Sequence, residues 1–370
     1  MTESLQPFQP ALRGLSQEAL CALFAEKGIP AFRGKQVFHW VQKKGVRDFE
    51  AMRNLPKELR ARLAEETRFG GIAETIAEKP SADGSVKFLF ALDDGKKIES
   101  VLMPGSGADA DKMTLCVSSQ VGCAVDCKFC VTGKNGFFRQ MTTAEIVDQA
   151  LYARHYLARQ NDGRLLRNIV FMGMGEPLLN TENVIPAIRL MIDHEGMDLS
   201  PRRITVSTSG ILPGLDELAQ SGMNAMLAIS LNAPTQEERE VIMPITRKYP
   251  LADLMEACRR YPLRGGARIT FEYVLMAGFN DSRRHAREII RLVHGIPTKI
   301  NVIPFNPDPA LPYQRPTDEA VLEFAEVIRA ANLTCSIRWS KALDVSGACG
   351  QLAGQYRQKT SGGYVVLPRE

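Results

Sequence analysis

The stretch CAVDCKFC, residues 123–130, carries three cysteines in a C-x3-C-x2-C arrangement, at Cys123, Cys127 and Cys130. A short apolar and β-branched run at residues 114–118 precedes it. The capping-box pattern Thr142-x-x-Glu145 follows it and predicts the start of a helix. The cysteines are therefore predicted on a loop between a strand and a helix, where parallel α/β sheets hold their ligands.

The strand, loop and helix pattern repeats along the rest of the chain. Further apolar runs occur at residues 168–172, 203–208, 225–231, 269–276 and 299–304. Six strands alternating with helices predict an α/β fold with a parallel sheet, either open or curved into a partial (β/α)6 barrel, because a TIM-type barrel has eight. Polar or glycine-rich sequences follow several runs, namely GMGEP at 173–177, STSG at 207–210, SLNAP at 230–234 and PFNP at 304–307.

The first 110 residues have a different organisation. Ser16 is a predicted N-cap for a helix that ends before Gly28, a second helix covers roughly residues 34–44, and a third begins after Pro56. Asp94-Gly95 predicts a hairpin turn between strands around residues 86–92 and 98–103. We expect a helical accessory domain over residues 1–80, a β-hairpin extension over 81–110, the barrel over 111–345 and a C-terminal segment over 346–370.

Composition indicates an ordinary globular protein. The 370 residues are 45% hydrophobic and 24% charged, no apolar run approaches a membrane span, and the first residues lack a signal-peptide pattern. We expect a cytoplasmic protein without a membrane partner, whose eight cysteines are metal ligands, catalysts or buried thiols rather than a disulfide framework. Residues 31–69 hold ten Lys or Arg against five Asp or Glu, with interleaved aromatics. This segment is either an RNA-binding surface or a solvated helix surface.

Three cysteines at this spacing leave three chemical alternatives. Structural zinc needs a fourth ligand, such as Cys116 or a distant residue. Redox chemistry through Cys127 and Cys130 lacks thioredoxin-like surroundings. An iron–sulfur cluster takes four ligands, so three thiolates leave one iron open for a substrate. Among the other cysteines, Cys349 lies in the small-residue stretch SGACGQLAG, which suits a mobile nucleophile.

The motifs together resemble the RlmN/Cfr family of radical S-adenosylmethionine (SAM) RNA methyltransferases. The resemblance runs from LRGLSQEAL and FRGKQVFHWV near the start almost to the end of the chain. Its central segments are LCVSSQVGCAVDCKFCVTGKNGF, FMGMGEPLLN, RRITVSTSG, LAISLNAP, KINVIPFNP and ACGQLAG. It implies a radical SAM partial barrel with a small N-terminal accessory domain, a [4Fe-4S] cluster and two SAM molecules per turnover.

The resemblance also implies a role for each motif residue. Cys349 is the expected methyl-accepting cysteine, Cys116 its resolving partner and Glu99 the general base. Cys123, Cys127 and Cys130 are the expected cluster ligands. The residues expected to contact SAM are Gly175, Glu176, Ser207, Ser230, Leu231, Asn232 and Asn306. Asn232 departs from the histidine of the family's SLHAP motif, which puts a side-chain role at this position in doubt.

The implied reaction is methylation of C2 of adenosine 2503 in 23S rRNA and of adenosine 37 in some tRNAs, through S-methylated Cys349 and a transient protein–RNA adduct. The expected partners are these RNAs and an electron donor such as flavodoxin or ferredoxin, and the expected state is a monomer. Two alternatives remain open, a methylation of C8 of the same rRNA adenosine and a zinc-bound RNA-binding protein without catalysis.

Overall fold

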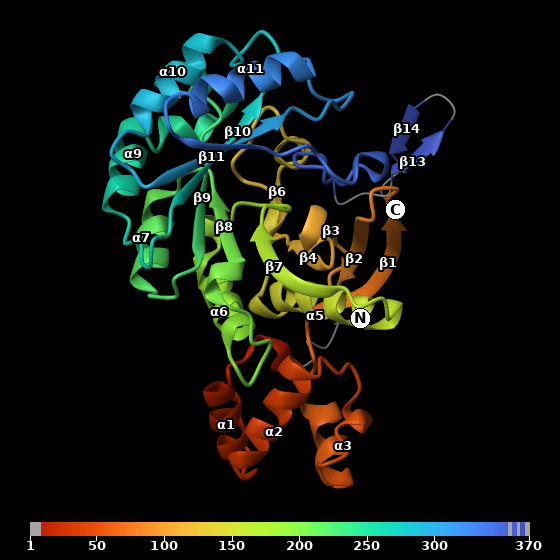
Figure 1. Ribbon diagram of the computed structural model, residues 1–370. Coiled ribbons are helices and arrows are strands. Elements are labelled where there is room, and N and C mark those ends of the chain that lie inside the picture. Colours follow the sequence, from red (N-terminus) through yellow and green to blue (C-terminus); the bar gives the residue numbers. More distant parts are fainter. Residues whose placement is uncertain (1–8, 354–356, 361–362, 367–370) are drawn as a thin grey trace, which may run out of the picture.

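A ten-stranded sheet forms the centre of the molecule, in the order β1-β2-β3-β4-β7-β8-β9-β10-β11-β12 (Figure 1). The computed structural model describes residues 9–353, 357–360 and 363–366. No helix within these residues is long and apolar enough to cross a membrane.

Six neighbouring strands of this sheet confirm the predicted parallel pattern. They are β4 (Lys112–Cys116), β7 (Leu165–Phe171), β8 (Ile204–Thr208), β9 (Met226–Ser230), β10 (Ile269–Leu275) and β11 (Thr298–Pro304). A further parallel strand, β12 (Thr334–Ile337), was not predicted. Cys116 of β4 and Lys299 of β11 line one cavity although four strands separate them in the sheet. The sheet is therefore strongly curved, as in a partial barrel.

Helices cover the outer face of this curved sheet (Figure 1). They are α5 (Thr143–Gln160), α6 (Thr181–Ile192), α7 (Leu212–Gln220), α9 (Leu251–Arg260), α10 (Arg283–Leu292) and α11 (Asp318–Arg329). The short helix α8 (Gln236–Ile242) follows β9, and its last residue accepts a hydrogen bond from the Lys128 amide in the cysteine loop. In β11 every residue except Lys299 is buried, because helices pack on one face and the interior is enclosed on the other. The predicted capping box of α5 is present, with Thr142 and Glu145 each accepting from the other's backbone amide.

An antiparallel extension continues the sheet beyond β4. The predicted hairpin is confirmed as β2 (Val86–Leu92) and β3 (Lys97–Pro104), and β3 pairs antiparallel with β4. Strand β1 (Ile72–Pro80) pairs with β2 and was not predicted. Near the C-terminus, β13 (Arg357–Thr360) and β14 (Gly363–Val366) form a separate hairpin. The domain boundaries expected at residues 80, 110 and 345 remain predictions.

The N-terminal helical unit lies at one end of the molecule (Figure 1). It contains α1 (Gln17–Glu26), α2 (Phe32–Phe38), which continues as a π-helical turn to Lys43, and α3 (Lys57–Glu66), as predicted. Buried Asp148 of α5 joins this unit to the barrel by pairing with Arg13 and with Arg47, whose Nη2 lies 2.6 Å away. The Ile72 amide also donates to Asp148, at 2.8 Å. These partners offset the cost of burying the carboxylate.

Candidate functional site

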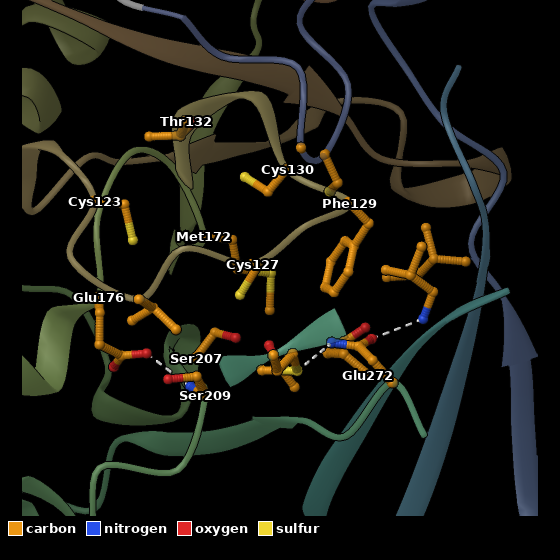
Figure 2. A pocket seen from close by; sticks show the side chains of 18 of the residues that line it. Cys123, Cys127, Phe129, Cys130, Thr132, Met172, Glu176, Ser207, Ser209 and Glu272 are labelled. Atoms are coloured by element: carbon orange, nitrogen blue, oxygen red, sulfur yellow. Dashed lines mark hydrogen bonds between the residues drawn. The ribbon is translucent and has the colours of Figure 1, made fainter. Parts of the chain in front are cut away.

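The three-cysteine loop follows one short strand and leads into a short helix, after which a second short strand pairs with the first. Strands β5 (Gln120–Gly122) and β6 (Phe137–Gln140) pair antiparallel, and α4 (Val131–Lys134) begins directly after the third cysteine. All three cysteine side chains line a cavity of about 170 Å³. Figure 2 shows them on one side of this cavity, with Glu176, Ser207, Ser209 and Glu272 on the other.

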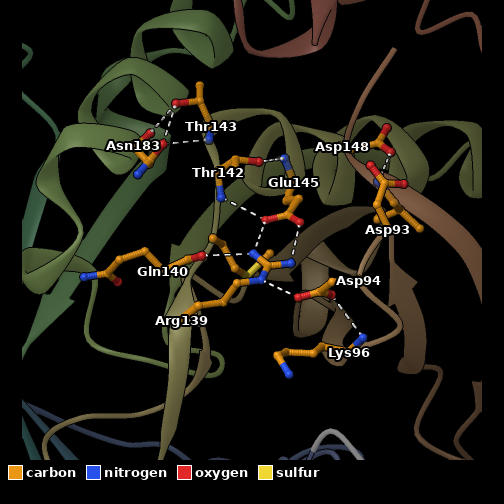
Figure 3. Close-up of polar contacts among 12 residues, drawn as sticks. Asp93, Asp94, Lys96, Arg139, Gln140, Thr142, Thr143, Glu145, Asp148 and Asn183 are labelled. Carbon is orange, nitrogen blue, oxygen red and sulfur yellow. Dashed lines mark hydrogen bonds and ion pairs between the residues drawn. The ribbon is translucent and has the colours of Figure 1, made fainter. Parts of the chain in front are cut away.

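A network around Arg139 holds this strand pair against the rest of the fold (Figure 3). Its guanidinium donates to both oxygens of Glu145 in the capping box, at 2.8 and 2.9 Å. Its Nε donates to Asp94 in the β2–β3 turn, at 2.6 Å. Hydrogen bonding to Glu145 raises the pKa of Arg139. Strand β6, which pairs with β5 next to the cysteine loop, is thereby bonded to both the β2–β3 hairpin and the start of α5.

Burial raises the pKa of each of the three thiols, to about 12 for Cys123. A metal centre must therefore replace the thiol protons when it binds here. Among the described residues, no three His, Cys, Asp or Glu side chains converge closely enough to hold a single ion. The donor set, three soft thiols around a shared cavity, fits an iron–sulfur cluster.

Glu176 lies opposite the cysteines, at the start of a 3-10 turn. Its Oε2 accepts from the Ser209 amide at 2.7 Å, and its Oε1 accepts from the Leu178 amide at 3.0 Å. Burial raises the pKa of Glu176. Gly175 precedes it with φ of +100°, and a Cβ there would lie 2.4 Å from the Cβ of Gln120. Only glycine therefore allows this close approach to β5.

The other predicted SAM contacts fall into two groups. Ser207, Ser230, Asn232 and Asn306 line the same cavity as the cysteines. Leu231 does not line it, and its backbone amide donates to the Glu272 carbonyl at 2.9 Å.

The backbone conformation and hydrogen bonds of Asn232 explain why asparagine fits this position. Its φ is +60°, in the left-handed region that asparagine tolerates well. Its Oδ1 accepts from the Val274 amide at 2.9 Å, and its carbonyl accepts from Asn280 at 2.7 Å. The side chain that replaces the family's histidine thus joins β9 to β10.

Two buried polar atoms on this side of the cavity have no hydrogen-bond partner among the described residues, Asn306 Oδ1 and Ser209 Oγ. A bound molecule with polar groups would satisfy them. This observation fits a SAM molecule beside the cysteines.

Arg239 of α8 is a fully buried cation that the sequence did not reveal as a site residue. Its guanidinium donates to the carbonyls of Ser209, Ser230 and Leu231 and to Thr246 Oγ1. Burial lowers its pKa to about 10, whereas nearby Cys127 and Glu176 act in the opposite direction. Arg239 therefore fixes the ends of β8 and β9 under the cavity.

Cys349 and Cys116 both line a second, larger cavity of about 600 Å³. Both are free thiols, and Cys349 is close enough to contribute to the raised pKa of Cys116, whose main cause is burial. Cys349 also lines the smaller cavity and therefore lies where the two cavities adjoin. Cys349 is exposed at the cavity wall. The surrounding protein reduces the hydration of its thiol and is the main cause that raises its pKa to about 11, and the nearby Glu272 and Cys130 raise the pKa further.

The loop that carries Cys349 is held in place, in contrast to the flexible context expected from its small residues. The Cys349 carbonyl accepts from Asn306 Nδ2 at 3.0 Å. The Val131 amide donates to the Gly350 carbonyl at 2.8 Å, and Thr132 donates to the Leu352 carbonyl at 2.6 Å. The cysteine loop and the Cys349 loop are thus directly hydrogen-bonded.

Glu99 lies outside both cavity linings, on β3. Its Oε1 is 2.9 Å from the Lys87 ammonium, and its Oε2 accepts from the Ala353 amide at 2.8 Å. Lys87 also donates to the Ser346 carbonyl at 3.3 Å. This ion pair therefore anchors the Cys349 loop on both sides.

Comparison with known proteins assigns the chain to a family. A protein of Anaeromyxobacter sp. (strain Fw109-5), named dual-specificity RNA methyltransferase RlmN, is 47% identical over 350 residues, which cover 94% of this chain and 91% of that protein. A protein of the same name from Nitratidesulfovibrio vulgaris (strain DSM 19637 / Miyazaki F) is 50% identical over 327 residues, covering 88% and 89%. The chain belongs to the RlmN family of RNA methyltransferases.

Family models and a solved structure agree with this assignment. The radical SAM superfamily model matches residues 117–293, and the ribosomal RNA large subunit methyltransferase N-terminal domain model matches residues 11–68. The crystal structure of a radical SAM methyltransferase from Sphaerobacter thermophilus is 42% identical, with a TM-score of 0.88, over 94% of this chain and all of that one. A [4Fe-4S] cluster and SAM are the cofactors that radical SAM membership implies, and the cysteine cavity fits both.

Three residues of the two cavities, Ser209, Glu272 and Asn301, were not predicted, and neither was Arg239, which lines neither cavity. Ser209 lies two residues after Ser207 in the STSG motif, and Arg239 lies in the charged segment QEEREVI, which is typical of a surface helix. Glu272 had a usable signal, because it is the one charged residue in the apolar run ITFEYVL. Asn301 likewise interrupts the apolar run of β11.

Proposed function

We propose that this radical SAM RNA methyltransferase methylates C2 of adenosine 2503 in 23S rRNA and of adenosine 37 in some tRNAs. The relatives' name, dual-specificity RNA methyltransferase, supports more than one RNA substrate. Pro177 in GMGEP supports methylation of C2 over C8. At this position the sequence resembles the C2-methylating members of the family, whereas the C8-methylating members carry alanine. The observation that carries the proposal is the pair Cys116 and Cys349 on the wall of one cavity, beside the three-cysteine cavity.

The chain's own residues divide the work. Cys349, as thiolate, accepts a methyl group and later carries the methyl carbon to the adenine. We assign to Glu99, which lies outside both cavity linings, the proton lost from C2; one electron leaves with it, and the cluster would take this electron up. Cys116, as thiolate, attacks the Cys349 sulfur, the bond from that sulfur to the methylene carbon breaks, and the carbon keeps the electron pair and takes up a proton to become the methyl group. Methylated RNA is released and a disulfide joins the two cysteines. Cys123, Cys127 and Cys130 would hold the cluster, and the strand-end residues would orient SAM. When bound, the cluster and SAM supply the hydrogen-abstracting radical chemistry that unreactive C2 requires, with two SAM consumed per turnover.

An anaerobic assay tests this proposal. The reconstituted enzyme, rRNA or tRNA, SAM and a reductant are incubated, and the digested RNA is analysed by mass spectrometry. We expect 2-methyladenosine, whereas 8-methyladenosine would contradict the proposed position. Cys116→Ala should accumulate a covalent protein–RNA adduct that Cys21→Ala, in the N-terminal unit, does not. An electron donor such as flavodoxin or ferredoxin, a cytoplasmic location and a monomeric state complete the proposal.

A further inference from the structure

The larger cavity combines two thiols with an unusual concentration of positive charge. Its lining contains six cationic side chains but only two carboxylates, Asp109 and Glu272. Within the described part of the chain, Arg202, Lys299 and Arg338 have no ion-pair partner. Such unpaired cations attract the phosphates of RNA. The remaining cationic residues of the lining are Lys112, Arg203 and Lys341.

Inside this basic surface lies a pair of buried polar side chains, Glu272 of β10 and Asn301 of β11. The two residues are partners in the parallel register, and they are 7% and 4% exposed. Asn301 Nδ2 donates to Glu272 Oε1 at 2.8 Å. Among the described residues, Glu272 Oε2 and Asn301 Oδ1 have no hydrogen-bond partner. The cavity is thus lined by two neighbouring hydrogen-bond acceptors that lack donors.

We propose that Glu272 and Asn301 recognise the exocyclic amino group of the target adenine. This inference rests on the proposed function and names the groups that select its base. An amino group offers two hydrogens, one for each acceptor, whereas the 6-oxo group of guanine or hypoxanthine would place a third acceptor against them. A site built to hydrogen-bond a substrate group rejects analogues that lack it, because its own acceptors then face the analogue without a donor.

The position of the pair favours the RNA base over the adenine of SAM. Glu272 lines both cavities, but Asn301 lines only the larger one, together with Cys116 and the unpaired cations. Glu272 also lies close enough to Cys349 to raise its pKa. Trp339 lines the same cavity and is 45% exposed, so it offers an aromatic face for stacking where the cavity meets solvent.

Base-substituted RNA tests the proposal in the reconstituted holoenzyme. Three otherwise identical stem-loops carry adenosine, inosine or purine riboside at the target, and all three retain a hydrogen at C2. We expect the wild type to prefer adenosine over purine riboside about 10- to 100-fold in kcat/KM, the range of one or two hydrogen bonds. Glu272→Gln should lose most of this preference, and Glu323→Gln, on the surface of α11, should keep it.

Two further measurements separate the possible sources of an effect. Methylation of Cys349 before RNA is added, read by mass spectrometry of the protein, reports on SAM alone. It should stay within about twofold of wild type in Asn301→Ala, because Asn301 lines only the larger cavity, whereas this variant should lose base preference as Glu272→Gln does. RNA affinity, read by fluorescence anisotropy, measures base preference without catalysis. The affinity difference between the adenosine and purine riboside stem-loops should be smaller in Glu272→Gln than in wild type. A variant that keeps the wild-type preference, or that loses Cys349 methylation as strongly as RNA methylation, would overturn the assignment to RNA. An 8-methyl product would contradict the proposed function but leave the base preference measurable.

Discussion

The ammonium group of Lys87 lies 2.9 Å from Oε1 of Glu99, and both side chains are buried. Lys87 contacts the backbone at Ser346, and Glu99 contacts it at Ala353, on either side of Cys349. The pair therefore positions the loop that carries the expected methyl acceptor. Its two members can be tested separately.

Lys87→Met removes the cation and leaves the Glu99 carboxylate buried without its counter-charge. We expect a loss of about 3–5 kcal/mol in the free energy of unfolding, as for other buried pairs that lose one partner. Urea unfolding followed by circular dichroism measures it. The double variant Lys87→Met, Glu99→Leu should regain part of the loss because neither charge remains, and a fully stable single variant would show that the pair is not required.

Glu99→Gln retains the size of the side chain and an oxygen for the Ala353 amide but cannot act as a base. The amide leaves the Lys87 ammonium without its counter-charge, so Cys349 methylation before RNA addition is measured alongside as the reference for the position of the loop. If Glu99 accepts the C2 proton, RNA methylation should fall about 100-fold more than Cys349 methylation. Nucleoside analysis and protein mass spectrometry report the two steps. Unchanged RNA methylation would exclude Glu99 as the base.

Cys127→Ala removes one expected cluster ligand from the cavity. We expect an anaerobically purified variant to lose the brown colour and most of its iron, whereas Cys258→Ala, in α9, keeps both. Metal analysis and visible absorbance distinguish the outcomes. A colourless wild-type protein that contains zinc would contradict the iron–sulfur assignment and support the non-catalytic alternative.

Stability should depend on pH through Glu272. Burial raises the pKa of this carboxyl, although Asn301, Arg338 and Lys299 act in the opposite direction. The folded state therefore binds the proton more tightly than the unfolded chain, and wild-type stability falls as pH rises from the ordinary pKa to the raised one. Glu272→Gln lacks this loss, so its advantage in urea unfolding should grow over that pH range and then level off. Glu323→Gln should show no such trend.

Lys43 and Lys44 are exposed on the N-terminal unit, at the end of the second helical segment. If this unit binds RNA, the double charge reversal Lys43→Glu, Lys44→Glu should weaken RNA binding and flatten its salt dependence, without changing Cys349 methylation. Arg47 is unsuitable for this test, because it pairs with buried Asp148 and its reversal would destabilise the fold. RNA affinity equal to wild type at several salt concentrations would exclude these lysines from the interface.

Much of the fold could be predicted from the sequence because the six parallel strands are short apolar runs with regular spacing. Strand β1 escaped prediction because IAETIAEKP is rich in residues that favour helices, and only pairing with β2 makes it a strand. Strand β12 is only four residues long, too short to show a pattern.

The residues of the candidate site could be predicted where they belong to a sequence motif. They could not be predicted where their role depends on contacts with backbone atoms. Cys123, Cys127, Cys130 and Glu176 share one cavity, as their motifs suggested. Arg239 could not be found, because its partners are mainly backbone carbonyls from three different residues, which leave no trace in the sequence.

The beginning of helix α5 carries two attachments at once. Asp148 pairs with Arg13 and Arg47 of the N-terminal unit. Thr142 lies six residues before it, at the capping box whose Glu145 binds Arg139 of the β5–β6 strand pair. Six residues of helix α5 span about 9 Å. The N-terminal unit and the β5–β6 strand pair therefore attach to the same short stretch of one helix, so a change in that stretch would displace both.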